Sequence, residues 1–195
     1  MRNGPLEELN LPEKGEFTQK ITLPHDWIVA DTDLYEKSSH GYYYREFDVN
    51  CIEQILYLYF EGVTQDCHIF INGRCACTWQ NGYTSFIVPL SGFIKKGVNE
   101  IVVACNYCLP NSRWYTGAGI YRNVWLIQKE ATHFLPQECY VNNVKEAEEF
   151  WKTTVSGRIQ SKEGPKRIGI GWKLTSTDIQ EMVAEGTVDW KSVIS

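Results

Sequence analysis

The sequence contains no run of basic residues and no long apolar stretch. Its net charge is −5 and its isoelectric point is near 5.4, so neither a nucleic-acid backbone nor an anionic membrane surface is an expected partner. No apolar segment approaches the roughly 20 residues of a membrane-spanning helix. The first residues, Met1–Glu8, lack the apolar core of a secretion signal. We therefore expect a cytoplasmic protein without nucleic-acid or membrane partners.

The spacing of the cysteines and histidines does not form a metal site. Seven cysteines are present, and an odd number without a secretion signal favours free thiols over a complete disulfide framework. Cys105 and Cys108 have the C-x-x-C spacing of zinc and redox sites, but no second C-x-x-C or C-x-x-H pair follows to complete a tetrahedral zinc site. We predict no metal and no cofactor, and we interpret the four histidines as structural hydrogen-bonding groups.

The hydrophobic pattern alternates with a period of two residues, which predicts β-strands. The Asn72-Gly73 pair predicts a two-residue hairpin loop, because both central positions of such a loop need a positive φ. Many short strands without a sustained helical stripe before residue 140 indicate an antiparallel sandwich or jelly roll. The predicted strands are Tyr42–Val49, Ile55–Phe60, Cys67–Ile71, Cys75–Trp79, Ser85–Pro89, Glu100–Cys105 and Val124–Gln128.

A change of pattern near residues 128–136 predicts a domain boundary. We place a first domain at residues 1–130 and a second, smaller sandwich at residues 131–195, with strands at Trp151–Gln160 and Arg167–Thr175. Lys145–Phe150 is either a short helical turn or a loop. The final segment, Ala184–Ser195, shows no turn or closing strand. Since a seven-stranded immunoglobulin-like sandwich takes about 100 residues, we expect the second sandwich to be truncated.

Three segments carry distinctive motifs. They read Leu-Pro-His-Asp-Trp at 23–27, Phe-Ile-Asn-Gly at 70–73 with Gly-Tyr-Thr-Ser-Phe at 82–86, and Ser-Arg-Trp-Tyr-Thr-Gly-Ala-Gly-Ile-Tyr-Arg at 112–122 before Asn-Val-Trp-Leu. Together they resemble the sugar-binding domain of glycoside hydrolase family 2, of the β-galactosidase/β-glucuronidase type. The resemblance implies an all-β fold, a galactose-binding-like jelly-roll sandwich followed by a partial immunoglobulin-like β-sandwich.

The loop at 112–122 supplies two candidate sugar-binding residues, Arg113 and Trp114. An aromatic face stacks on the C–H face of a pyranose while neighbouring polar groups bind its hydroxyls. Filling of the domain core, or covering of the neighbouring domain, is an equally good interpretation of Trp114. Arg113 stands where family members have an Asp that touches the sugar, so an acceptor becomes a donor. Galactose and glucuronate both stay open as the sugar, because a guanidinium favours an acidic or otherwise oxygen-rich substituent.

The polar loop before Tyr42 supplies the remaining candidates. The resemblance implies that this loop reaches the mouth of an active site, so Asp33, Tyr35 and Glu36 are candidates for sugar contact. An ordinary solvated loop is an equally good interpretation. Four residues of the first and third motifs are better explained by a structural role than by sugar contact. We interpret them as residues that order the loops: His25, Asp26, Trp27 and Arg122.

The resemblance implies a retaining glycosidase mechanism with two catalytic Glu carboxylates on a (β/α)8 barrel. A barrel takes roughly 250 residues of alternating strand and helix, and no such alternation is present. We therefore predict no catalytic residue in this chain and no activity of the chain alone. Its expected partners are a β-galactoside or β-glucuronide and the catalytic barrel of the parent enzyme. The alternatives are an independent lectin-like carbohydrate-binding module and a purely structural docking domain.

Overall fold

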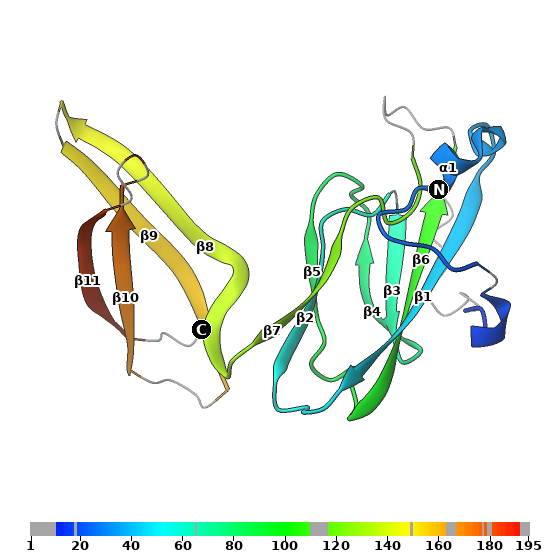
Figure 1. The fold of residues 1–195 in the computed structure, drawn as a ribbon, viewed down its shortest axis with the longest axis horizontal. Coiled ribbons are helices and arrows are strands. Elements are labelled where there is room, and N and C mark those ends of the chain that lie inside the picture. Colours follow the sequence, from blue (N-terminus) through cyan, green and yellow to red (C-terminus); the bar gives the residue numbers. More distant parts are fainter. Residues whose placement is uncertain are drawn as a thin grey trace. The chain divides into compact units, whose positions relative to one another are not determined.

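The computed structural model describes residues 11–17, 19–64, 66–109, 117–148, 150–162, 167–176, 178 and 181–191. These residues are almost entirely β-strand, and they belong to two compact units, residues 1–128 and 129–195 (Figure 1). The predicted all-β fold class is thus confirmed. Among the described residues, none of the helices has the length and apolar composition of a membrane span.

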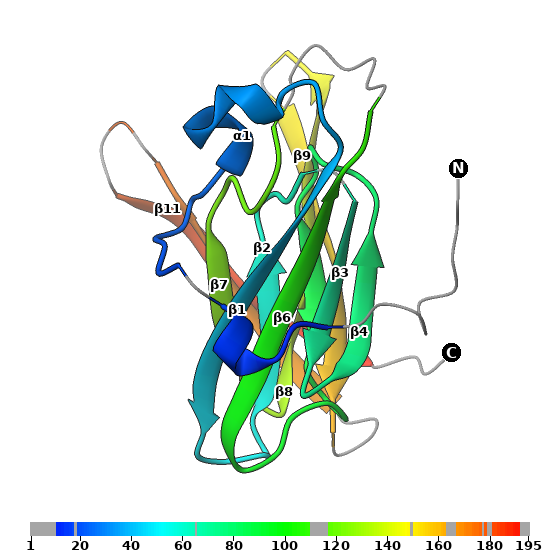
Figure 2. The ribbon, with the colours of Figure 1, turned by 90° about the vertical axis from the view of Figure 1, so that its right-hand side faces the viewer.

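The first unit is a sandwich of two sheets (Figure 2). A four-stranded sheet has the order β1-β6-β3-β4, and a three-stranded sheet has the order β5-β2-β7. Neighbouring strands of the larger sheet are antiparallel. The strands are β1 (Ser39–Val49), β2 (Ile55–Phe60), β3 (Asp66–Ile71), β4 (Arg74–Trp79), β5 (Phe86–Pro89), β6 (Gly97–Tyr107) and β7 (Val124–Lys129).

The predicted hairpin joins β3 to β4. Asn72 has φ 50° and Gly73 has φ 77°, as a two-residue loop with two positive φ values requires. The side chain of Asn72 also donates to the carbonyl of Phe93 at 2.9 Å and to Oδ1 of Asn99 at 2.8 Å. These contacts fix the turn against the neighbouring loop, and the antiparallel pairing of β3 with β4 confirms the prediction.

Apolar side chains from both sheets fill the space between them. Phe60 and Phe86 stack with ring centroids 4.9 Å apart. Ile69 and Val103 face them from the four-stranded sheet and are fully or almost fully buried. Burying one such side chain stabilises a fold by about 1.5–3 kcal/mol, so this core holds the two sheets together and fixes the strand ends from which the loops emerge.

The second unit consists of two antiparallel hairpins, β8 (Thr132–Ala147) with β9 (Phe150–Ser161) and β10 (Arg167–Thr175) with β11 (Met182–Lys191). A helical turn or a loop was considered for Lys145–Phe150 from the sequence, but β8 continues to Ala147 and β9 begins at Phe150, with a turn at residue 148.

The expectation that no strand closes the final segment was wrong, because β11 pairs with β10 over most of its length. Gly186 conceals the strand in the sequence, since it interrupts the apolar alternation. In the structure it lies opposite Trp172, and a Cβ added to Gly186 would come within 2.8 Å of the Trp172 ring. A glycine here therefore makes room for a cross-strand aromatic ring.

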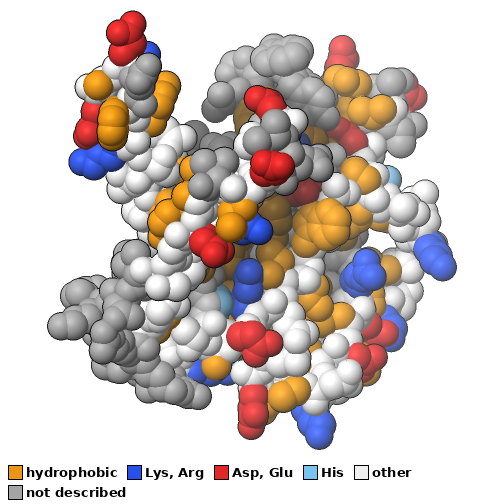
Figure 3. Space-filling view, turned by 60° about the vertical axis from the view of Figure 1, so that its left-hand side comes forward, with side chains coloured by type: hydrophobic (Ala, Val, Ile, Leu, Met, Phe, Trp, Pro, Cys, Tyr) orange, Lys and Arg blue, Asp and Glu red, His pale blue; other side chains and the backbone are white. Residues whose placement is uncertain are grey.

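Large apolar side chains also reach the surface between charged ones (Figure 3). Trp125 and Leu126 of the first unit are exposed, and so are Phe150, Trp151 and Trp172 of the second. Single exposed apolar residues are ordinary on a protein surface, and we assign no function to them.

Candidate functional site

Segments far apart in the sequence meet at one end of the first sandwich. The short helix α1 (Trp27–Ala30) and the 3-10 turn η3 (Thr32–Leu34) precede β1 there (Figure 1). The segment 117–123 returns to the same end before β7. The N–H of His25 donates to the carbonyl of Ile120 at 2.8 Å, and the N–H of Trp27 donates to that of Ala118 at 3.2 Å. Two of the three sequence motifs are thus hydrogen-bonded to one another.

Asp26 connects these two segments through one carboxylate oxygen. Oδ1 accepts hydrogen bonds from the backbone N–H groups of Ile28 at 3.0 Å and Val29 at 3.3 Å, which makes Asp26 the N-cap of α1. The same oxygen accepts from the N–H of Ala118 at 3.1 Å. Ala118 is fully buried, so its N–H cannot bond to water. Without Asp26 this N–H would have no hydrogen-bond acceptor.

Tyr43 of β1 lies beneath the segment. Its hydroxyl is 2.9 Å from Nδ1 of His25, and it accepts from the N–H of Ile120 at 3.4 Å. Burial raises the pKa of Tyr43, so the phenol remains protonated and serves as a hydrogen-bonding group. Gly119 has φ +117°, and a Cβ on it would overlap the Tyr43 hydroxyl and come within 2.8 Å of the His25 carbonyl. The segment can approach this closely only because residue 119 is glycine.

Trp27 is held on two sides. Its indole Nε1 donates to Oγ of Ser39 at 3.0 Å, and its ring covers Gly41, where a Cβ would overlap the ring. The ring also lies near Tyr43, with centroids 6.3 Å apart. These contacts of His25, Asp26 and Trp27 are with the backbone and side chains that position the loops.

Asp33, Tyr35 and Glu36 lie on the exposed part of the same end. The Tyr35 ring is 42% exposed, while its carbonyl accepts from the Tyr107 hydroxyl at 3.0 Å, which anchors the loop to the end of β6. The backbone N–H of Asp33 donates to Oδ1 of Asp31 at 3.1 Å. Within the described part of the chain, the carboxylates of Asp33 and Glu36 have no hydrogen-bond or ion-pair partner. These carboxylates remain available as acceptors.

Arg113 and Trp114 lie outside the described residues. Residues 110–116 are not described, and Leu109 and Ala118, which lie before and after them, are bound to the segment that carries the other candidates. The N–H of Leu109 donates to Oγ of Ser38 at 3.0 Å, and Ala118 is bound by Asp26. Leu109 and Ala118 are thus both hydrogen-bonded to side chains within residues 26–38.

Arg122 contacts an aromatic ring. Its guanidinium lies 5.1 Å from the centroid of the Tyr121 ring, and the Tyr121 hydroxyl donates to the carbonyl of Gly82 at 2.6 Å. This places the third motif against the loop of the second. Arg122 also lines an open pocket with Glu61 and Tyr83.

Sequence reasoning missed Tyr43, Glu61 and Ser38. Strand alternation shows that Tyr43 faces the opposite side from its two tyrosine neighbours, but it does not indicate the contact with His25. Glu61 follows a buried strand directly, at a position where polar residues often lie at the rim of a site, and this was the available indication.

The described residues do not bring together the side chains of a metal centre. No group of three or more His, Cys, Asp or Glu side chains is arranged for metal binding in this part of the chain. The thiols are free. What the arrangement offers is a rigid end of a sandwich with exposed carboxylates, hydroxyls, a guanidinium and aromatic rings, which suits the binding of a polar ring.

Comparison with known proteins places these motifs in a family. The family model "Glycosyl hydrolases family 2, sugar binding domain" matches residues 15–130. A β-galactosidase of Bacteroides ovatus is 33% identical over 127 residues, which cover 58% of this chain and 15% of that enzyme. A Formosa agariphila protein that carries the name of a β-glucuronidase is 32% identical over 134 residues, 62% of this chain and 16% of its own length.

Solved structures show the same fold. A glycosyl hydrolase family 2 member from Bacteroides cellulosilyticus has a TM-score of 0.80 at 22% identity, covering 97% of this chain and 28% of that one. The chain thus spans 15% and 16% of the length of the two named relatives. The sequence motifs, the sandwich fold and the similar proteins all indicate the same family.

Proposed function

This chain belongs to glycosyl hydrolase family 2, and we propose that its first unit forms part of the sugar pocket of a retaining β-glycosidase. The observation that carries the proposal is the meeting of the first and third motifs at one end of the sandwich, bound together through Asp26. A sandwich that served only as a spacer would not need two remote loops fixed to each other beside a row of exposed polar groups.

Two sets of residues have different roles in this proposal. Asp33, Tyr35 and Glu36 contact sugar, together with Arg113 and Trp114. His25, Asp26 and Trp27 order the loops that carry them, and Arg122 orders the third motif by packing on the Tyr121 ring. The exposed, unpaired carboxylates of Asp33 and Glu36 support the first role, because carboxylates accept hydrogen bonds from sugar hydroxyls. The part-buried hydrogen bonds of Asp26 support the second.

The substrate in this proposal is a terminal β-galactoside or β-glucuronide. The names of the two relatives support both sugars equally. Cleavage belongs to a partner, the catalytic barrel of the parent enzyme, whose paired carboxylates would act as acid/base and nucleophile. The chain alone would then bind sugar weakly and hydrolyse nothing. We also propose that residues 1–130 form the sugar-binding domain and residues 131–195 the start of an immunoglobulin-like domain.

A ¹⁵N NMR titration of the whole chain tests the proposal. Methyl β-D-galactoside and methyl β-D-glucuronide should shift amide signals of residues 31–38 and 111–118, with a dissociation constant in the millimolar range because only part of a pocket is present. Asp33→Asn and Glu36→Gln should weaken this binding. Glu148→Gln, an exposed glutamate of the second unit, is the matched control and should not.

Other outcomes would support the alternatives. Absence of shifts at about 100 mM sugar would contradict the proposal and favour a structural docking domain. Micromolar binding, about a thousandfold tighter, would favour an independent lectin-like module, since about 4 kcal/mol more binding free energy would then come from this chain alone.

A further inference from the structure

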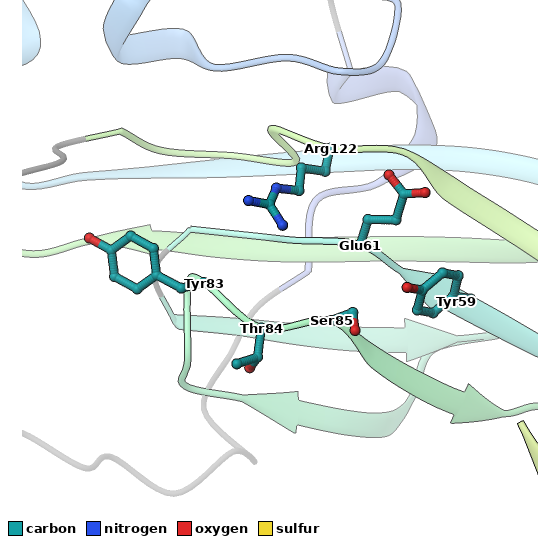
Figure 4. Close-up of a pocket in the computed structure, with 6 residues that line it drawn as sticks. All are labelled: Tyr59, Glu61, Tyr83, Thr84, Ser85 and Arg122. Carbon is teal, nitrogen blue, oxygen red and sulfur yellow. The ribbon is translucent and has the colours of Figure 1, made fainter. Parts of the chain in front are cut away.

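An open pocket of about 610 Å³ lies on the first unit beside the end of β2. It is lined by Tyr59 and Glu61 from the end of β2, by the turn Tyr83-Thr84-Ser85 that leads into β5, and by Arg122 before β7 (Figure 4). Its volume falls within the range of pockets that hold small ligands, about 300–1,000 Å³. Three separate segments contribute to it, and the Tyr121 hydrogen bond to Gly82 joins two of them.

The guanidinium of Arg122 is the charged group that points into this pocket. In Figure 4 it extends toward Tyr83 and the turn that carries Thr84. The ion pairs of the described residues are Lys14–Glu46, Lys152–Glu146 and Arg158–Glu138, and none of them involves Arg122. Its packing over the Tyr121 ring orients the guanidinium and leaves its N–H edge available.

The Glu61 carboxylate does not form an ion pair with the Arg122 guanidinium, because it points away from it (Figure 4). Oε1 accepts from the indole N–H of Trp125 at 2.9 Å, and Oε2 accepts from the side chain and backbone of Asn123 at 3.1 and 3.3 Å. The Trp125 bond, followed by those of Asn123 and the nearby charge of Arg122, lowers the pKa of Glu61. The carboxylate thus holds the β7 end of the pocket in place.

The remaining lining residues suit a sugar ring. Tyr83 is 40% exposed and presents part of its ring to solvent, and Thr84, Ser85 and Tyr59 carry hydroxyl groups. Aromatic rings contact the C–H face of a pyranose, and hydroxyls exchange hydrogen bonds with its OH groups. A single inward-pointing guanidinium pairs best with a carboxylate, which it binds through two parallel N–H groups.

We propose that this pocket is a binding subsite for an acidic sugar residue, a hexuronate whose carboxylate pairs with Arg122 while its ring lies against Tyr83. The subsite goes beyond the proposed function, because it uses none of the residues from 33 to 36 and its occupation needs no catalytic barrel. It would give the chain a preference for uronate-containing glycosides at a place separate from the loop of Asp33.

The test is a titration of the whole chain, followed by ¹⁵N NMR, with four small molecules: methyl β-D-glucuronide, its methyl ester, methyl β-D-galactoside and acetate. The glucuronide should shift the amides of residues 83–85 and the side-chain Nε of Arg122. The ester and the galactoside lack the charge and should bind there at least tenfold more weakly. Raising the salt concentration should weaken the glucuronide binding.

Variants separate charge from geometry. Arg122→Ala should reduce glucuronide affinity about tenfold or more, and Arg122→Lys, which keeps the charge without the two parallel N–H groups, should be intermediate. Arg158→Ala, at an exposed arginine of the second unit, is the matched control and should bind like the original chain. Arg122→Lys also guards against a folding defect in the alanine variant.

Several results would overturn the subsite. One is equal affinity for glucuronide and galactoside at residues 83–85, and another is glucuronide binding that survives Arg122→Ala. The third is acetate binding as strong as that of the glucuronide, which would indicate a simple anion site. Shifts confined to residues 31–38 would overturn the subsite and leave the proposed function intact. Shifts confined to residues 83–85 and Arg122 would support the subsite and contradict the proposed function.

Discussion

Replacing Asp26 by alanine removes three hydrogen bonds that converge on one oxygen atom. Two of them cap α1, and loss of an N-cap side chain costs about 1 kcal/mol. The third satisfies the N–H of Ala118, which is fully buried, and an unsatisfied buried donor costs about 1–3 kcal/mol. The free energy of unfolding of the first unit should therefore fall by about 2–4 kcal/mol.

Urea unfolding followed by tryptophan fluorescence and far-UV circular dichroism measures this loss. Amide hydrogen exchange locates it, because Ala118 and Ile28 should exchange faster in Asp26→Ala. Asp26→Asn keeps an acceptor oxygen and caps a helix about as well as Asp, so it should retain at least half of the lost stability. Asp33→Ala, at an exposed carboxylate, should change stability by less than about 0.5 kcal/mol.

The reasoning would be refuted if Asp26→Ala cost no more than Asp33→Ala. It would also be refuted if the Ala118 amide kept its protection in Asp26→Ala, because another acceptor would then satisfy it.

Two further predictions concern the same unit. Gly119→Ala should lower its unfolding free energy by more than about 2 kcal/mol, because φ +117° and the Tyr43 hydroxyl leave no room for a Cβ; Gly15→Ala, where nothing lies within 4 Å, is the control, and equal urea midpoints would contradict us. Burial raises the pKa of the Cys67 thiol to about 12, so an alkylating reagent should modify the exposed Cys75 in native buffer and reach Cys67 only in urea. Mass spectrometry of the labelled peptides would show this order, and equal labelling would count against it.

Local chemistry made parts of the fold predictable. The Asn72-Gly73 hairpin follows from two adjacent residues that tolerate positive φ, and the core strands follow from alternation. The strand β11 did not follow, because Gly186 replaces an apolar side chain where the Trp172 ring lies opposite. The need for a glycine at position 186 comes from Trp172 on the paired strand, so the sequence of the segment alone does not reveal it.

The candidate site was only partly predictable for the same reason. The first and third motifs marked His25, Asp26 and Trp27 as residues that order a loop, but nothing local indicated that Asp26 would bind Ala118. The direction of the Arg122 side chain depends on the Tyr121 ring and on the separate engagement of Glu61 by Trp125. Such directions are set by packing between segments, and residue spacing carries no information about them.

The hydrogen bond between Asp26 and Ala118 joins residues 92 positions apart in the chain. Closing so long a loop is entropically unfavourable until the intervening strands have paired, and contacts of high sequence separation slow folding. We therefore expect this bond to form after β1 and β6 have brought its two partners together. Under the proposed function, sugar binding at this end of the sandwich would then report on completion of the fold as well as on recognition.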